Sequence, residues 1–202
     1  EGYLSGAKAL CEKYNVLFIA DEVQTGIART GKMIAVDYEE VKPDILILGK
    51  ALSGGAYPVS AVLADDRIMG VISPGNHGST FGGNPIAAAV AIAALEVVKE
   101  EKLAENAFEL GELFRDELNK FIPHTDLVNS VRGKGLLNAI LINDSEDSST
   151  AWDICMALKE NGLLAKPTHG NIIRFAPPLV MTKEQLLDCV SIIIKTLKEF
   201  KN

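Results

Sequence analysis

The chain has 202 residues, of which 48% are apolar and 23% are charged, with 17 glycines and 8 prolines. This composition is typical of a folded globular protein and excludes collagen-like, low-complexity and wholly disordered chains. The 20 Lys and Arg residues against 27 Asp and Glu residues give a net charge of −7. Because no basic block is present, neither a nucleic acid nor a membrane is an expected partner. The three cysteines lack metal-ligand spacing, so we expect no metal site and a reducing compartment.

The first half of the chain alternates between predicted helices and strands. A helix is expected over residues 4–14, and continuous apolar runs predict strands over residues 16–20, 45–48 and 59–64. Such runs are typical of strands that are buried on both faces of a mostly parallel sheet, which indicates an α/β fold. Asn84 followed by Pro85 is a good helix start, and that helix should run to about Glu100.

The second half predicts a smaller α+β unit. Apolar spacings of three and four indicate an amphipathic helix over residues 102–121. Strands are expected over residues 128–131 and 136–142, on either side of a Gly133-Lys134-Gly135 turn, and again over 163–166 and 172–175. A helix should begin near Ala151, with Ser149 or Thr150 as its N-cap, and run through Asn161, with Gly162 as the C′ residue. Thr182 with Gln185 predicts a capping box for the last helix. We therefore expect two domains, residues 1–101 and 102–202.

Two charged residues follow predicted parallel strands directly. Asp21 comes after the run at residues 16–20, and Lys50 comes after Gly49 at the end of the run at residues 45–48. The carboxyl ends of parallel strands are where open α/β sheets bind ligands. An ion pair at the end of the sheet is one interpretation. The other is a site for pyridoxal phosphate (PLP), which needs a lysine amine and an acidic partner for its pyridinium nitrogen.

An ordered set of motifs resembles the class-III PLP-dependent aminotransferases. In the first half these are Asp21-Glu22-Val23-Gln24-Thr25-Gly26, Arg29-Thr30-Gly31, Lys42-Pro43-Asp44, Gly49-Lys50-Ala51-Leu52-Ser53-Gly54-Gly55 and His77-Gly78-Ser79-Thr80-Phe81-Gly82-Gly83-Asn84-Pro85. In the second half, residues 131–139, 162–170 and 173–179 are most similar to family members that act on ornithine. Members that act on acetylornithine or 4-aminobutyrate are the alternative.

The resemblance implies a role for each of six residues. Lys50 matches the lysine that forms the Schiff base with PLP and moves protons, and Asp21 matches the aspartate that keeps the pyridine nitrogen protonated. Gln24 matches the residue near the phenolic oxygen, Thr80 with Ser79 beside it matches a phosphate ligand that reaches across a dimer interface, and Arg174 matches the substrate-carboxylate clamp. The alternatives are turn roles for Gln24 and Thr80 and a surface charge for Arg174. Glu22 is expected to be structural.

The resemblance also implies the surroundings of the site. It predicts the PLP-dependent fold type I, with residues 1–101 as part of the large PLP-binding domain and residues 102–202 as the small domain. Amino acids and 2-oxo acids would be the substrates of a homodimer that works by a ping-pong route. Because family members are much longer, we expect this chain to be a fragment, with a non-catalytic dimerisation piece as the alternative. A cytoplasmic location is expected, with the mitochondrial matrix as the alternative.

Overall fold

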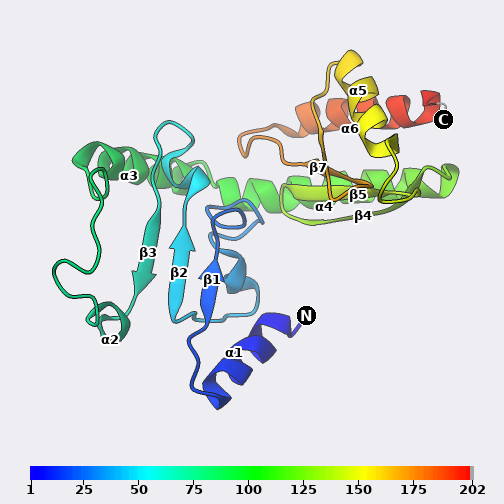
Figure 1. Ribbon diagram of the computed structural model, residues 1–202. Coiled ribbons are helices and arrows are strands. Elements are labelled where there is room, and N and C mark those ends of the chain that lie inside the picture. The colour runs from blue at the N-terminus through cyan, green and yellow to red at the C-terminus, as the bar shows by residue number, and fades with distance from the viewer. Residues whose placement is uncertain (201–202) are drawn as a thin grey trace. The chain divides into compact units, whose positions relative to one another are not determined.

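The structure is a computed structural model that describes residues 1–200 (Figure 1). It divides the chain into two compact units, one spanning Glu1–Ala104 and the other beginning at Glu105. No helix within residues 1–200 has the length and apolar character needed to cross a bilayer. That the units are a portion of a PLP-binding domain and a small domain stays a prediction.

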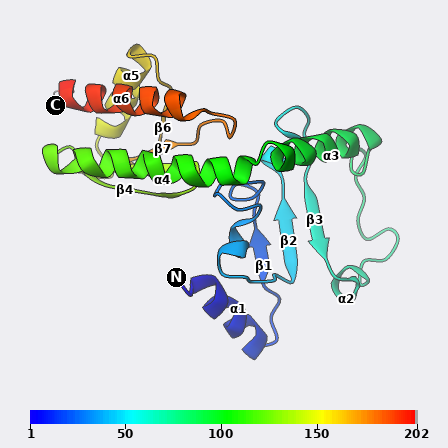
Figure 2. The ribbon, with the colours of Figure 1, turned by 180° about the vertical axis from the view of Figure 1, so that it is seen from behind.

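The first unit is built on a three-stranded sheet. Its elements are α1 (Tyr3–Lys13), β1 (Ile19–Asp21), η1 (Ala35–Tyr38), β2 (Ile45–Leu48), η2 (Lys50–Ser53), β3 (Ala61–Ala64), α2 (Asp66–Met69) and α3 (Pro85–Glu100). The strand order is β1-β2-β3, with β2 in the middle. β1 and β2 run parallel, so they end at the same edge of the sheet. Figures 1 and 2 show α3 at this edge and α1 at the opposite one.

The third strand differs in direction from the expected parallel arrangement. β3 pairs with β2 in antiparallel register, with Leu48 opposite Ala61. Within this chain alone, Ile19 and Val62 are 53% and 54% exposed. An apolar run fixes neither strand direction nor the number of covering layers, because both depend on neighbours elsewhere in the sequence. The mixed α/β architecture itself is as expected.

Asp44, from the Lys42-Pro43-Asp44 motif, ties α1 to the start of both parallel strands. Its Oδ2 accepts hydrogen bonds from Lys8 Nζ and from the backbone N–H of Phe18, each at 2.8 Å. The bond from the Lys8 ammonium, followed by the one from Phe18, holds the pKa of the Asp44 carboxyl below its usual value. Asp44 is therefore a structural residue at the end of the sheet opposite Lys50.

The second unit is a four-stranded sheet covered on one face by helices. Its elements are α4 (Leu103–Phe121), η3 (Ile122–His124), β4 (Val128–Lys134), β5 (Leu137–Ile142), α5 (Thr150–Glu160), β6 (Lys166–Thr168), β7 (Ile172–Phe175) and α6 (Lys183–Glu199). The strand order is β4-β5-β7-β6, and all neighbours are antiparallel. Along β5, every second residue is fully buried, so one face lies against α4, α5 and α6 and the other stays open.

The core of this unit joins all three helices to the sheet. Phe114 of α4 packs on Phe175 of β7 with ring centroids 5.5 Å apart, and Ile140, Leu158 and Ile193 are almost completely buried. Cys155 lies in the same core, where burial raises the pKa of its thiol to about 11. The cysteine is therefore an apolar packing group, as its place on an amphipathic helix suggests.

The expected caps at Asn84 and Thr182 are confirmed, whereas Ser149, which precedes α5, makes no side-chain cap bond. Strand boundaries also differ from those expected. The Asn84 side chain accepts the Ala87 N–H at 2.9 Å, and Thr182 and Gln185 form a capping box. β4 continues to Lys134, so the hairpin turns at Gly135 and Leu136 rather than over residues 133–135. The strand expected at residues 163–166 lies instead at Lys166–Thr168, where β6 pairs with β7.

A close approach of helix α4 to the β4–β5 turn requires a glycine at position 111. A Cβ atom on Gly111 would lie 1.9 Å from the carbonyl oxygen of Gly135. We expect Gly111→Ala to lower the free energy of unfolding by about 3 kcal/mol, because this overlap with backbone outweighs the better helix propensity of alanine. Urea denaturation measures the change. Gly6→Ala in α1, where a Cβ meets nothing within 4 Å, is the control and should cause no loss.

Candidate active site

The parallel pairing of β1 and β2 brings Asp21 and Lys50 to one edge of the sheet. Asp21 is the last residue of β1 and lies opposite Ile47, and the ladder continues through a 2.9 Å bond from the Glu22 N–H to the Ile47 carbonyl. Lys50 follows Ile47 by three residues. With strands about 4.8 Å apart and about 3.3 Å per residue, the two Cα atoms lie within about 11 Å of each other.

The backbone at Lys50 turns sharply out of the strand. Lys50 has a φ of 44°, in the left-handed region that side-chain-bearing residues seldom occupy. Such conformations occur preferentially at functional sites, where the surrounding structure maintains them. The lysine side chain is exposed, and its amine makes no hydrogen bond or ion pair within residues 1–200. The amine is therefore available for chemistry rather than used in a salt bridge with Asp21.

Only one of the two oxygens of the Asp21 carboxylate accepts a hydrogen bond within residues 1–200. Oδ1 accepts the N–H of Val23 at 3.1 Å, which fixes the side chain in a local turn, and the residue is exposed. Oδ2 has no hydrogen-bond partner among the described residues. The carboxylate thus has a fixed position and one oxygen that can accept a bond from a ligand.

Glu22 and Gln24, which follow Asp21 on this segment, have opposite environments. Glu22 is 3% exposed, and its carboxylate accepts bonds from the Val36 N–H at 2.9 Å and from the Thr25 hydroxyl. Its expected structural role is confirmed. Gln24 is exposed, and its side chain makes no hydrogen bond within residues 1–200. Gln24 is therefore free to meet a ligand near Asp21.

A hollow of about 460 Å³ brings Lys50 together with the loop that precedes α3. The residues on the loop side are Phe81, Gly82, Gly83 and Asn84. Ser79 and Thr80 lie immediately before them and are exposed. The Ser79 hydroxyl oxygen accepts the Gly82 N–H at 2.8 Å, so it stabilises the loop turn, whereas Thr80 makes no such bond in the described part of the chain.

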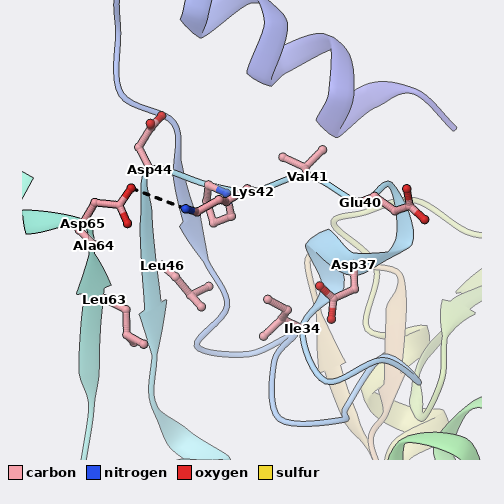
Figure 3. Close-up of a pocket in the computed structure, with 11 residues that line it drawn as sticks. Ile34, Asp37, Glu40, Val41, Lys42, Asp44, Leu46, Leu63, Ala64 and Asp65 are labelled. Atoms are coloured by element: carbon pink, nitrogen blue, oxygen red, sulfur yellow. Dashed lines mark ion pairs between the residues drawn. The ribbon is translucent and has the colours of Figure 1, made fainter. Parts of the chain in front are cut away.

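A second hollow, of about 600 Å³, lies at the other end of the sheet (Figure 3). It is lined by Asp37, Glu40, Lys42 and Asp65, among others, and its one drawn ion pair joins Lys42 Nζ to Asp65 Oδ2 at 3.6 Å. Both side chains of this pair are mostly exposed, so their attraction is weak. The hollow is larger than the one beside Lys50, but it lies where β2 begins and lacks the unpaired lysine.

Arg174 belongs to the second unit and lies on the open face of its sheet. The strand registers place Arg132, Ala139, Arg174 and Lys166 opposite one another in a single row across all four strands. The cations Arg132, Arg174 and Lys166 therefore share this face. Ala139 lies between Arg132 and Arg174, whereas Arg174 and Lys166 are direct neighbours. None of the three cations forms an ion pair within residues 1–200. Like charges directly opposite each other are unfavourable unless an anion lies between them. The sequence motifs indicate Arg174 alone; the row depends on strand pairing.

Comparison with known proteins shows which family the chain belongs to. The family model for class-III aminotransferases matches residues 1–197. The chain belongs to the class-III aminotransferase family. Ornithine aminotransferase, mitochondrial, of Drosophila melanogaster is 66% identical over 98% of the chain and 44% of its own length. The crystal structure of acetylornithine aminotransferase from Elizabethkingia anophelis is 74% identical with a TM-score of 0.96, covering 99% of this chain and 52% of that one.

A third relative connects the family with its cofactor. Ornithine aminotransferase of Toxoplasma gondii, 51% identical with a TM-score of 0.93, covers 97% of this chain and 46% of its own and has been described with partial PLP occupancy at its active site. Class-III aminotransferases depend on PLP. The residues of this chain fit PLP, because three features lie at one edge of the sheet. These are the unpaired amine of Lys50, the Asp21 carboxylate with one free oxygen, and the hollow that Gly82 and Gly83 line. The chain spans about half the length of these relatives.

Proposed function

We propose that the protein to which this chain belongs is an ornithine aminotransferase. It would transfer the terminal amino group of L-ornithine to a 2-oxo acid, forming glutamate 5-semialdehyde and an amino acid by a ping-pong mechanism. The observation that carries the proposal is the unpaired Lys50 amine at the same sheet edge as Asp21. Six residues of this chain would contribute to the site.

Bound PLP supplies an electron sink for the negative charge that develops at the reacting carbon of the substrate. Lys50 Nζ would bind the cofactor covalently and then, once released, carry a proton to and from the reacting carbon. The Asp21 carboxylate would hold a proton on the pyridine nitrogen through its free oxygen. Gln24 would donate a hydrogen bond to the phenolic oxygen. The Thr80 hydroxyl, with Ser79 beside it, would bind a phosphate oxygen of the second subunit's cofactor.

Arg174 would clamp the substrate α-carboxylate, since a guanidinium matches a carboxylate with two parallel hydrogen bonds. Its position among unpaired cations supports an anionic ligand.

We expect Arg174→Gln to lower kcat/KM by about 10²-fold, mostly through KM, because charged hydrogen bonds to the carboxylate are lost. Steady-state kinetics of the full-length enzyme measure this effect. Arg67→Gln, at an exposed residue of α2, should leave both constants unchanged.

The second candidate substrate is N-acetylornithine, because the 74% identical structure is of an acetylornithine aminotransferase. The curated relatives at 52–66% identity are named ornithine aminotransferases, which supports ornithine. Measuring kcat/KM for L-ornithine, N-acetylornithine and 4-aminobutyrate with one preparation of the full-length enzyme separates the candidates. A preference for N-acetylornithine would assign the protein to the alternative.

A homodimer with shared sites is part of the proposal. Residues 71–83, which include Thr80, are exposed throughout, as a loop that meets a second subunit would be in an isolated chain. Sedimentation of the full-length enzyme tests this state.

For the cellular location of the protein, the cytoplasm and the mitochondrial matrix remain the two proposals. The name of the Drosophila relative supports the matrix.

A further inference from the structure

Glu22 connects the end of β1 to a loop that folds back beside it. Successive residues of a strand point to opposite faces, so Asp21 is exposed while Glu22 is 3% exposed on the other side. The Glu22 Oε1 atom accepts the Val36 N–H at 2.9 Å, across 14 residues, and Oε2 accepts the Thr25 hydroxyl. One buried carboxylate thus ties both ends of the loop of residues 25–36 to the strand end.

The loop that Glu22 holds has an unfavourable backbone. Ile27 and Ala28 have φ values of 52° and 68°, in the left-handed region, and are 3% and 0% exposed. Two consecutive residues with side chains rarely adopt this conformation without support from their surroundings. Further bonds run from the Thr30 hydroxyl to the Thr25 carbonyl at 3.2 Å and from the Tyr38 hydroxyl to the Thr30 carbonyl at 2.6 Å. The first of these bonds uses Thr25 directly, and the second joins Tyr38 to its partner Thr30.

Gln24 lies between the two anchoring points of this network. It directly precedes Thr25, whose hydroxyl bonds to Glu22, and it follows Val23, whose N–H bonds to Asp21 Oδ1 at 3.1 Å. The backbone carbonyl of Glu22 also accepts the Gly26 N–H at 2.9 Å, and a Cβ on Gly26 would lie 2.7 Å from that carbonyl oxygen. The turn that carries Gln24 therefore has very little freedom while Glu22 keeps its partners.

We propose that Glu22 is a positioning residue, which sets the places of Asp21 and Gln24 against the cofactor ring through its bonds to Thr25 and Val36. This inference rests on the proposed function. Glu22 itself is buried while Asp21 is exposed, so Glu22 would not contact the cofactor. Without its carboxylate, the loop would relax, and the two side chains that meet the pyridine nitrogen and the phenolic oxygen would lose their fixed geometry.

The test compares PLP binding and the visible absorption band of the bound cofactor in the full-length protein. We expect Glu22→Ala to weaken PLP binding about tenfold, because a buried N–H and hydroxyl lose a charged acceptor, and to shift the pH midpoint of the band. Glu22→Gln keeps an acceptor for the Val36 N–H and should stay within about threefold of wild type. Unchanged affinity and band in Glu22→Ala would overturn the proposal.

Glu39 supplies a matched control, since its carboxylate also accepts one backbone N–H and one hydroxyl. Both come from Ser5, at 2.9 and 2.7 Å, and hold α1 rather than the loop beside Asp21. Glu39→Ala should leave the cofactor band unchanged, and an equal shift in that variant would contradict a specific role for Glu22. If Glu22→Ala does not fold, the same measurement is made on Thr25→Val. A shift in the pH midpoint of its cofactor absorption band supports the proposal, and an unchanged midpoint overturns it. Wild-type protein that binds no PLP would contradict the proposed function instead.

Discussion

Replacing Lys50 with alanine in the full-length protein should reduce the rate of transamination by at least about 10⁴-fold. The amine would act twice, first as the nucleophile that holds the cofactor and then as the base and acid at the reacting carbon, and proton transfer alone contributes about 10²–10⁴-fold. Because the amine has no ion-pair partner in residues 1–200, its loss leaves no buried charge behind and should not unfold the protein. Single-turnover and steady-state assays with ornithine measure the loss.

Lys42 is the matched control for this experiment. It lies at the opposite end of β2, is 83% exposed and makes only a weak ion pair with Asp65 (Figure 3). Lys42→Ala should keep the wild-type kcat. Full transamination by Lys50→Ala would show that another amine is the nucleophile, and addition of a small primary amine to Lys50→Ala should restore part of the rate if the lost group is the base.

Asp21→Asn should lower kcat by about 10³-fold while leaving the fold intact. An amide is nearly the same size as the carboxylate and can still accept the 3.1 Å bond from the Val23 N–H, but it lacks the negative charge that keeps a ring nitrogen protonated. The cofactor then withdraws electrons less strongly from the reacting carbon. The change should appear in kcat more than in KM, since the charge acts chiefly in the transition state.

The pH dependence of the bound cofactor's absorption provides the second measurement for Asp21→Asn. The nitrogen should lose its proton at lower pH in the variant, because the anion that stabilises its charged form is gone. Asp37→Asn, which removes an exposed carboxylate at the other end of the sheet, should change neither kcat nor the titration. A wild-type titration in Asp21→Asn would place the acidic partner elsewhere.

Much of the candidate site follows from local sequence. Asp21 and Lys50 lie at strand ends because each apolar run stops just before them, and parallel strands share their carboxyl edge. The caps at Asn84 and Thr182 were predictable for a similar reason, since a capping side chain bonds within three residues along the chain. The ordered motifs between Asp21 and Leu179 indicated the family from the residues alone, and the family model matches residues 1–197.

Strand direction and register were beyond local reasoning. The antiparallel β3 shares its apolar pattern with a parallel strand, and the row of Arg132, Arg174 and Lys166 exists only because three separate strand pairs align. A register shift of one residue would turn each of these side chains to the other face. The Glu22–Val36 bond likewise joins residues 14 positions apart in a loop without periodicity.

The sequence by itself determined that Asp21 and Lys50 follow apolar runs and that Asn84 and Thr182 cap helices, because these features are set by neighbours a few residues away; its ordered motifs also indicated the family. Only the tertiary structure decided which charges stay unpaired, which cations share a face and which carboxylate supports the loop beside Asp21. Those properties depend on contacts between segments that are distant along the chain, and such contacts form only when strands pair and side chains are buried.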